Sequence, residues 1–233
     1  WDLMTGTYNT LRQFLVAFST DSGSLTVNDY VPASTPTTNI DLKRDLSVGT
    51  TSQAKFTEDG VTFGEGSLWG LPQMGEVVGF YYNKALLAQL GIEAPVTWDD
   101  LDAALAAAKA AGQLPLQFGN LEAWPGIHLF GAVQSRYIPA DQIRDLGFGR
   151  PGAEWTTEEN LRAAQTLVDW VDAGYVTPEF NGITPDDAWQ AFAQGEGVFM
   201  LGGTWLLADL MSAMGDDVGF TVLIAPGTDM PVA

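Results

Sequence analysis

A run of β-branched and aromatic residues that turns directly into a helix is the most constraining feature of this sequence. Residues 77–82 read VVGFYY, the composition that a buried strand prefers. Asn83 follows at once and can cap a helix, and Gly91 is placed to end it. The helix between them is expected to bury one face, formed by Leu86, Leu87 and Leu90. A strand joined to a helix without a linker predicts an α/β unit with the strand in its core.

Strands and helices alternate through the rest of the second half of the chain. Apolar runs predict further strands at residues 114–118, 198–201 and 218–224. Helices are expected after three threonines that precede periodic apolar segments, namely Thr97, Thr156 and Thr184. A core helix is expected at 127–134, between loops at 119–125 and 135–151. This alternation predicts an α/β fold.

The helix expected after Thr156 can be described in more detail. Thr156 and Glu159 have the spacing of a capping box, as do Thr97 and Asp100 before the earlier helix. Four apolar residues then repeat at helical spacing and are expected to form the buried stripe, namely Leu161, Ala164, Val168 and Val171.

The first third of the chain has weaker patterns. A strand is expected at residues 1–4 and a short amphipathic helix at 8–18. Residues 19–66 are rich in Ser, Thr, Asn, Gly and Pro, which indicates surface connections. The chain begins at Trp1 without an initiator methionine or a signal region and stops just after a strand-like run, so we expect a fragment of a longer protein.

The charge of the chain excludes one class of partner. The sequence has 29 acidic and 10 basic residues and a formal net charge of −19. Nucleic acid binding depends on Lys and Arg, so a nucleic acid partner is not expected. The acidity is explained either by a solvated, solubilising surface or by a role in binding cations.

The absence of cysteine and the near absence of histidine exclude several kinds of catalytic site. With no Cys there are no disulfides, thiolate zinc sites or cysteine nucleophiles. With His128 alone, a histidine metal cluster or a Ser-His-Asp triad is nearly excluded. His128 lies in an apolar stretch and is interpreted as a core or pocket-wall residue. No cofactor or metal site is predicted.

Three places carry side chains that suit ligand binding, and each also has a purely structural explanation. Glu76 precedes a strand and is either a ligand contact or a surface carboxylate. The loop with Asn120, Glu122 and Trp124 follows a strand, where open α/β sheets bind ligands, but a plain loop with a packed tryptophan explains it equally.

The third place is the turn Gly203-Thr204-Trp205. Glycine lets the backbone approach a ligand, and the start of the following helix offers free N–H donors. A tight connection with a core tryptophan is the alternative. The chain's eight tryptophans and six tyrosines favour an uncharged, hydroxyl-rich ligand, because aromatic faces with polar tips suit such molecules.

An ordered set of motifs resembles one protein family. WGLPQ, Glu76, YYNKALLAQLGI, PVTWDDLDAAL, GEGVFMLGGTW and VGFTVLIAPG occur in this order from about residue 2 to 228. They resemble the bacterial ABC-transporter extracellular solute-binding proteins of the carbohydrate, maltose-binding-protein-like group.

The resemblance implies a fold of two α/β lobes joined by hinge strands, of the periplasmic-binding-protein type. Residues 1–76 would belong to lobe 1, which is incomplete in this chain. Residues 77–217 would form a nearly complete lobe 2, and 218–233 would be the return hinge strand and the start of the return to lobe 1.

The resemblance also implies roles for individual residues. Glu76 would accept a hydrogen bond from a sugar hydroxyl at the hinge, and Glu122 and Trp124 match a polar and aromatic pair of a lobe 2 loop. Trp205 matches a stacking tryptophan of the family. Asn9 corresponds to a polar loop of lobe 1, where the maltose binder has an acid.

The implied function is the extracellular sugar-binding component of an ABC importer, which captures a mono- or oligosaccharide by hinge closure and is not an enzyme. Its partners would be the sugar and a membrane permease, and the protein is expected to be monomeric and extracellular or periplasmic, lipid-anchored or secreted. One alternative is a glycoside hydrolase that uses Glu76 and Glu122. The other is the same fold with a polyamine, metal or peptide as ligand.

Overall fold

The computed structural model describes residues 55–56, 67–68 and 76–223. The chain divides into two compact units, residues 1–75 and 76–233. In the first unit, two short strands pair antiparallel, β1 (Lys55–Phe56) and β2 (Ser67–Leu68). The strand and helix expected within residues 1–18, and Asn9 with them, lie outside the described residues.

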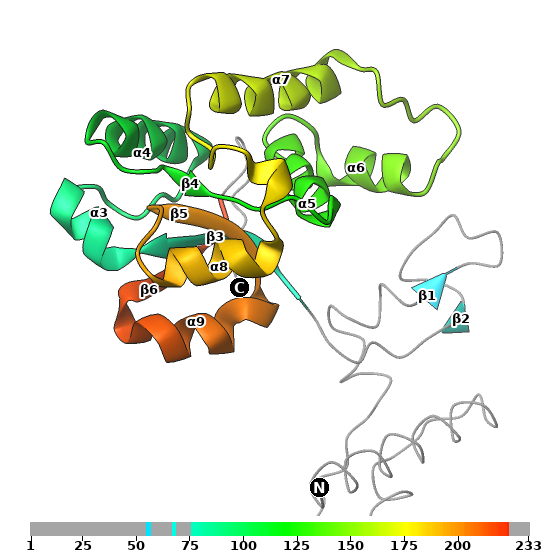
Figure 1. The fold of residues 1–233 in the computed structure, drawn as a ribbon. Coiled ribbons are helices and arrows are strands. Elements are labelled where there is room, and N and C mark those ends of the chain that lie inside the picture. Colours follow the sequence, from blue (N-terminus) through cyan, green and yellow to red (C-terminus); the bar gives the residue numbers. More distant parts are fainter. Residues whose placement is uncertain (1–54, 57–66, 69–75, 224–233) are drawn as a thin grey trace, which may run out of the picture. The chain divides into compact units, whose positions relative to one another are not determined.

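The second unit is built on a four-stranded mixed sheet with the order β4-β5-β3-β6 (Figure 1). Its strands are β3 (Val78–Asn83), β4 (Leu116–Gln117), β5 (Phe199–Gly203) and β6 (Val218–Thr221). β4 and β5 are parallel, whereas β3 is antiparallel to both of its neighbours. β3 therefore has hydrogen-bonded strands on both edges, which suits its β-branched and aromatic composition.

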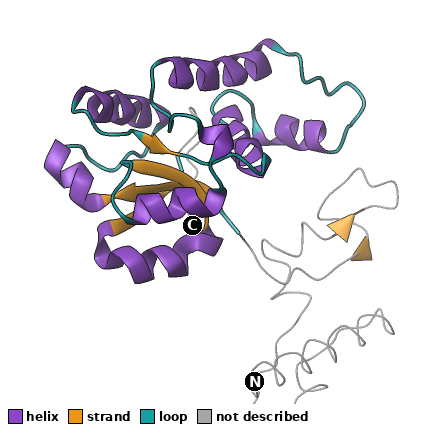
Figure 2. Ribbon diagram, viewed as in Figure 1, coloured by secondary structure: helices purple, strands orange, loops and turns teal. Residues whose placement is uncertain are grey.

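Helices cover both faces of this sheet (Figure 2). The α-helices are α3 (Lys84–Leu90), α4 (Trp98–Ala110), α5 (Trp124–Gln134), α6 (Ala140–Gly147), α7 (Glu158–Asp172), α8 (Pro185–Ala193) and α9 (Leu207–Met214). Three short 3-10 turns complete the unit, η3 (Phe180–Gly182), η4 (Thr204–Leu206) and η5 (Gly215–Asp217). The predicted α/β fold is confirmed, but strands and helices do not alternate one by one, because α3 and α4 lie between β3 and β4 and four α-helices lie between β4 and β5.

The two faces of the sheet carry separate hydrophobic clusters. Successive side chains of a strand point to opposite faces, so Phe80 joins the cluster that contains α3, α4, α5 and α7, whereas Tyr81 joins the cluster under α8 and α9. β5 alternates in the same way, with Phe199 in the first cluster and Met200 in the second. The unit therefore has three layers, with the sheet between two layers of helices.

Several predicted helix ends are confirmed. Leu86 N–H donates to Asn83 Oδ1 at 3.0 Å, and Gly91 ends α3 in the left-handed conformation with φ 66°. Thr97 and Asp100 form the expected capping box at the start of α4. Thr184 caps α8 by accepting from the backbone N–H of Asp187 at 3.0 Å.

The predicted start of the long helix α7 is wrong by one residue. The cap is Thr157 rather than Thr156, and Thr157 Oγ1 accepts from the backbone N–H of Asn160 at 3.3 Å. The capping box expected between Thr156 and Glu159 is therefore not formed.

The predicted buried stripe of α7 is also wrong. Leu161, Val168 and Val171 are 59%, 49% and 44% exposed. The buried face is shifted by one position along the helix and consists of Asn160, Ala163 and Trp170. The buried Asn160 is satisfied because Gln134 Nε2 of α5 donates to its Oδ1 at 2.6 Å, and Ala163 and Trp170 beside it join the hydrophobic core.

Two loop predictions also need correction. Residues 135–151 contain α6, which the short segment ADQIRDLG did not predict. The loop expected at 119–125 ends earlier, since α5 begins at Trp124 with Pro125 in its first turn, a position that proline tolerates. Within residues 76–223, no helix combines the length and apolarity needed to cross a membrane.

Candidate functional site

A pocket lies in the second unit beyond the carboxyl ends of the parallel strands β4 and β5. The space between its side chains is about 400 Å³, including the part open to solvent. It is lined by Val78, Gln117, Phe118, Gly119, Trp124, Pro125, His128, Pro185, Ala188, Trp189, Met200, Leu201, Gly202, Trp205 and Leu206. Open α/β sheets bind ligands at this edge.

Trp205 reaches the pocket because β5 ends in glycine. A Cβ built on Gly203 would lie 1.8 Å from the ring of Trp205, so a side chain at position 203 would occupy the space of the indole. The turn is fixed on its other side by Thr204, whose N–H donates to the carbonyl of Val77 at 3.0 Å and whose Oγ1 accepts from Val77 N–H at 3.2 Å. Gly203 thus permits the position of Trp205 without lining the pocket itself.

Trp124 is positioned by a tight turn before α5. Ala123 adopts a left-handed conformation with φ 64°, and its N–H donates to the carbonyl of Asn120 at 2.9 Å. The side chain of Asn120 also holds this turn, since its Oδ1 accepts from Gly126 N–H at 2.8 Å and its Nδ2 donates to Asn181 Oδ1 at 2.8 Å. Asn120 therefore positions the start of α5 and does not line the pocket.

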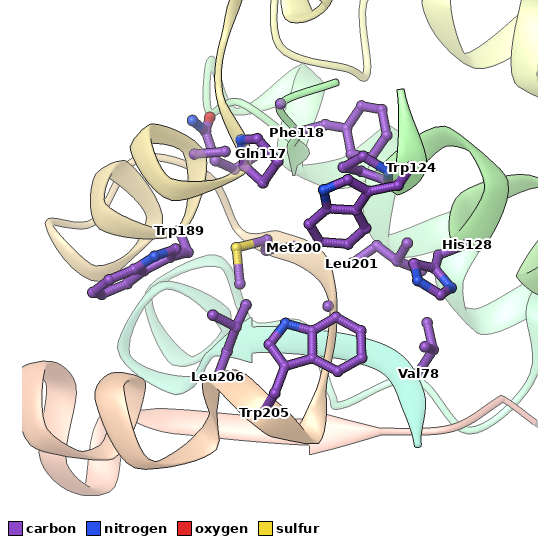
Figure 3. Close-up of a pocket in the computed structure, with 15 residues that line it drawn as sticks. Val78, Gln117, Phe118, Trp124, His128, Trp189, Met200, Leu201, Trp205 and Leu206 are labelled. Atoms are coloured by element: carbon purple, nitrogen blue, oxygen red, sulfur yellow. The ribbon is translucent and has the colours of Figure 1, made fainter. Parts of the chain in front are cut away.

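Trp124, His128 and Trp205 form an aromatic wall. The ring centroids are 5.5 Å apart for Trp124 and His128, 5.7 Å for His128 and Trp205, and 6.0 Å for Trp124 and Trp205. Both contacts of Trp124 are edge-to-face, with interplanar angles of 79° and 65°. In Figure 3 the indoles of Trp124 and Trp205 lie on the side of Met200 away from Trp189, and His128 lies to their right. Each of the three rings therefore packs against the other two.

Carboxylates hold two of the indoles. Trp124 Nε1 donates to Glu122 Oε2 at 2.9 Å, and Trp189 Nε1 donates to Asp186 Oδ1 at 3.3 Å. Neither Glu122 nor Asp186 lines the pocket, and both are exposed. These carboxylates orient the tryptophans, and among the described residues no carboxylate lines the pocket.

The polar part of the lining is small. Gln117, at the end of β4, is buried, and its Oε1 accepts from Thr177 Oγ1 at 3.0 Å. His128 is half-buried. The remaining side chains of the lining are apolar or aromatic, so the pocket suits a ligand with apolar faces and few charges. In the part of the chain that the structure describes, no three His, Asp or Glu residues are grouped so that they could hold a metal ion.

The sequence-predicted site residues have different places in the structure. Trp124 and Trp205 line the pocket together. Gly203, Asn120 and Glu122 do not line it but contact or position these two tryptophans. Glu76 is exposed and does not line the pocket, and Asn9 lies outside the described residues.

The sequence did not identify two residues of the pocket lining, Trp189 on α8 and Gln117 at the end of β4. Trp189, which the sequence did not mark as a ligand residue, is half-buried and lines the pocket from α8. Gln117 had a usable signal, because it is a polar residue inside an otherwise apolar strand segment, LPLQF. His128, expected in the core or in a pocket wall, lies in the pocket wall.

Comparison with proteins of known sequence finds relatives that are longer than this chain. A multiple sugar-binding protein of Streptococcus mutans serotype c is 25% identical over 143 residues, which are 60% of this chain and 34% of that protein. The chain thus spans about a third of the length of this curated relative.

Solved structures with the same fold are also longer. A chitin oligosaccharide binding protein is 26% identical with a TM-score of 0.63, over 71% of this chain and 42% of that one. A structure from work on xylan utilization by the thermophilic bacterium Caldanaerobius polysaccharolyticus is 23% identical with a TM-score of 0.61, over 86% and 48%. These similarities show the α/β fold of a two-lobed solute-binding protein, of which this chain is a part.

One protein family matches nearly the whole chain. The family described as bacterial extracellular solute-binding protein matches residues 8–230. The chain belongs to the family of bacterial extracellular solute-binding proteins.

Proposed function

We propose that the protein is the sugar-binding component of an ABC importer and captures a mono- or oligosaccharide outside the cytoplasmic membrane. The observation that carries this proposal is the aromatic wall of Trp124, His128 and Trp205 in a pocket whose described lining residues include no Asp, Glu, Lys or Arg. Aromatic faces cover the apolar faces of sugar rings, and an uncharged lining suits an uncharged ligand.

The names of similar proteins support a carbohydrate ligand. The relative from Streptococcus mutans is called a multiple sugar-binding protein, and one of the similar structures is called a chitin oligosaccharide binding protein.

The proposed mechanism is closure of two lobes around the sugar. Residues 1–76 would belong to lobe 1, residues 77–217 to lobe 2, and residues 218–233 to the strand that returns to lobe 1. The antiparallel pairing of β3 with β6 supports this proposal, because the two chain segments proposed to connect the lobes are adjacent. A sugar that contacts both lobes would favour the closed state.

Within this proposal the predicted residues take different parts. Trp124 and Trp205 would contact the sugar from lobe 2, and Gly203, Asn120 and Glu122 would hold these indoles in place. Glu76 would accept a hydroxyl hydrogen bond at the hinge, and Asn9 would contribute from lobe 1. A permease in the membrane would receive the sugar, and the protein would act as a monomer, secreted or anchored by a lipid.

The hydrolase alternative finds little support in the geometry. Glycoside hydrolysis needs two carboxyl groups at the sugar, one of them with a raised pKa. Glu76 and Glu122 are both exposed, neither lines the pocket, and the Glu122 carboxylate is bonded to Trp124. We therefore propose a binding protein without catalytic activity.

Isothermal titration calorimetry tests the proposed function. The purified protein is titrated with diacetylchitobiose, xylobiose, galactose, raffinose and maltose, and separately with spermidine. We expect at least one carbohydrate to bind with micromolar affinity, a free energy of about −8 kcal/mol. Trp205→Ala should weaken that binding, and Trp155→Ala, an exposed tryptophan outside the pocket, should not.

Binding of spermidine in place of all five carbohydrates would overturn the proposal and favour the cationic-ligand alternative. Release of free sugar from aryl glycosides would instead support the hydrolase. Equal affinities in Trp205→Ala and the parent would show that the sugar binds away from the aromatic wall.

A further inference from the structure

Thr204, the residue before Trp205, is bonded to the chain just before β3. The N–H of Thr204 donates to the carbonyl oxygen of Val77 at 3.0 Å, and its Oγ1 accepts from the N–H of Val77 at 3.2 Å. Val78 lies opposite Gly203 in the ladder between β3 and β5, so these two bonds continue that ladder by one residue. Both backbone groups of Val77 are therefore bonded to a single residue.

The hydroxyl of Thr204 takes the place of its own carbonyl oxygen in this pair. In a regular antiparallel pair, the backbones of two opposite residues exchange both hydrogen bonds. Here the carbonyl oxygen of Thr204 accepts instead from the N–H of Leu207 and closes the turn η4, which carries Trp205. The side-chain hydroxyl supplies the missing acceptor. The chain can thus turn away from β5 while Val77 stays bonded.

Two proposed sugar contacts flank this pair of residues. Trp205 follows Thr204 in the sequence, and Glu76 precedes Val77. Side chains of an extended chain alternate between its two faces, which favours for Glu76 the face of Val78, a residue of the pocket lining. The backbone path from Glu76 to Trp205 therefore runs through the bonds between Val77 and Thr204.

The two ends of this path are held unequally. On the side of Trp205, the hydroxyl of Tyr81 donates to the carbonyl oxygen of Gly203 at 2.9 Å, and the indole occupies the space that a Cβ on Gly203 would take. On the other side, Val77 is 47% exposed, and Thr204 bonds both of its backbone groups. Loss of the Thr204 hydroxyl should therefore release the chain at Val77 more than it moves Trp205.

We propose that Thr204 is a positioning residue of the sugar site, which holds Glu76 in place relative to Trp205 through its bonds to Val77. This inference rests on the proposed function, because it assigns Glu76 and Trp205 to the same sugar. A sugar that contacts both residues binds more tightly when their spacing is fixed in advance, since less freedom is lost on binding. The effect is reciprocal, so the bound sugar also strengthens the bond to Val77.

Two substitutions of Thr204 isolate its hydroxyl. Thr204→Val keeps the branched shape and the backbone bond to Val77 but removes the acceptor, whereas Thr204→Ser keeps the acceptor. The tightest-binding carbohydrate of the panel is titrated calorimetrically into both variants and the parent. We expect affinity to fall about three- to tenfold in Thr204→Val, the effect of one hydrogen bond, and to stay within about twofold of the parent in Thr204→Ser. Thr156→Val, at an exposed threonine outside the pocket, is the control.

Hydrogen exchange at the N–H of Val77 measures the bond itself. Nuclear magnetic resonance of the whole chain follows this amide with and without the carbohydrate. Exchange should be faster in Thr204→Val than in the parent and in Thr204→Ser, because the acceptor of this N–H is removed. Addition of the carbohydrate should slow the exchange in the parent. A hydroxyl that only stabilised the fold would leave this amide unaffected by the sugar.

A double-mutant cycle tests the connection to Glu76. In a chain that already carries Glu76→Ala, the carboxylate that Thr204 is proposed to position is absent. Thr204→Val should then change the affinity by less than about twofold, so the two substitutions should be clearly non-additive.

The possible results distinguish this inference from the proposed function. Parent-like affinity in Thr204→Val, or an equal loss in Thr204→Ser, would overturn the role of the hydroxyl and leave the proposed function intact. Additive effects of Glu76→Ala and Thr204→Val, or exchange at Val77 that the carbohydrate does not slow, would do the same. If none of the carbohydrates binds, the proposed function fails and this inference fails with it.

Discussion

The hydroxyl of Tyr81, in the middle of β3, donates a hydrogen bond of 2.9 Å to the carbonyl oxygen of Gly203 at the end of β5. Tyr81 is completely buried, under the layer formed by α8 and α9. Gly203 is followed directly by the turn that carries Trp205. This bond therefore connects the central strand of the sheet to the aromatic wall of the pocket.

Replacing Tyr81 by Phe should destabilise the protein by about 1 to 3 kcal/mol, because the buried carbonyl of Gly203 loses its partner. Urea denaturation monitored by circular dichroism measures the change. Tyr82→Phe is the matched control, since the described structure gives the Tyr82 hydroxyl no hydrogen bond and its ring lies over Gly219. Equal loss of stability in the two variants would contradict a role for the Tyr81 hydroxyl.

Stability should fall in alkaline solution through Tyr81. Burial raises the pKa of Tyr81 to about 12, from an ordinary value of 10.0. Because the folded pKa is the higher one, this contribution is complete below about pH 10 and is lost as the pH rises toward 12. At about 1.4 kcal/mol per pKa unit, the total is about 2 to 3 kcal/mol.

The measurement is urea denaturation between pH 9 and 11.5 for the parent protein and for Tyr81→Phe. The parent should lose its advantage over the variant as the pH rises, because the variant has no phenol at this position. A difference in unfolding free energy that stays constant over this range would contradict the assignment.

The start of α7 allows a test with adjacent residues. Thr157→Ala should cost about 1 kcal/mol, because its hydroxyl oxygen caps the helix by accepting from Asn160 N–H. Thr156→Ala, one residue earlier and exposed, should change the unfolding free energy by less than about 0.5 kcal/mol. Thermal or urea denaturation of both variants decides which threonine caps the helix.

The contact between β3 and β6 depends on Gly79. A Cβ at this position would lie 2.5 Å from the carbonyl oxygen of Thr221 and 2.7 Å from the ring of Phe220. Gly79→Ala should therefore destabilise the protein by about 1 to 3 kcal/mol. Gly131→Ala, where a Cβ within α5 would meet nothing within 4 Å, should instead stabilise it by about 0.5 to 1 kcal/mol. The expected result is that the unfolding free energy, relative to the parent protein, falls in Gly79→Ala and rises in Gly131→Ala.

The proposed role of Glu76 predicts a change in binding without a change in stability. Glu76 is exposed, so Glu76→Ala should alter the unfolding free energy by less than about 0.5 kcal/mol. If its carboxylate accepts a sugar hydroxyl, sugar affinity should fall about tenfold or more, since a hydrogen bond to a charged group contributes about 1.5 to 3 kcal/mol. Glu93→Ala, also exposed, is the control. Unchanged affinity in Glu76→Ala would leave Glu76 as a surface residue.

Local chemistry made much of the second unit predictable. Asn83, Thr97 and Thr184 each cap a helix at the predicted place, because a cap depends on a side chain and the backbone three residues away. The strand over 77–82 was predictable from its composition and is observed as Val78–Asn83. These signals are contained within a few residues, and distant parts of the chain do not alter them.

The rotation of α7 was not predictable because two stripes of its sequence compete. Leu161, Val168 and Val171 form an apolar stripe that is exposed, whereas Asn160 and Trp170 lie on the buried face. On the observed face, Asn160 accepts a hydrogen bond from Gln134, which lies 26 positions earlier, and Trp170 packs in the hydrophobic core. Periodicity within one helix contains no information about such a partner.

The candidate site was predictable only where its signal lies close to a strand in the sequence. Trp124 and Trp205 follow strands, a position that sequence alone can mark as a ligand site. Trp189 completes the pocket only because α8 packs beside β4 and β5. The hydrogen bonds that commit Asn120 and Glu122 to the turn before α5 likewise become visible only in three dimensions.

The pairing of β3 with β6 has a consequence for how such a segment could be inserted into another protein. The second unit begins at β3 and its last described strand is β6, and Phe80 lies opposite Thr221. These two strands are therefore neighbours, although some 140 residues separate Phe80 and Thr221 along the chain. A segment with adjacent ends can be carried as an insertion by a host protein. Residues 78–221 thus form a segment with adjacent end strands that contains the residues lining the pocket, and such a segment has the geometry of an insertion.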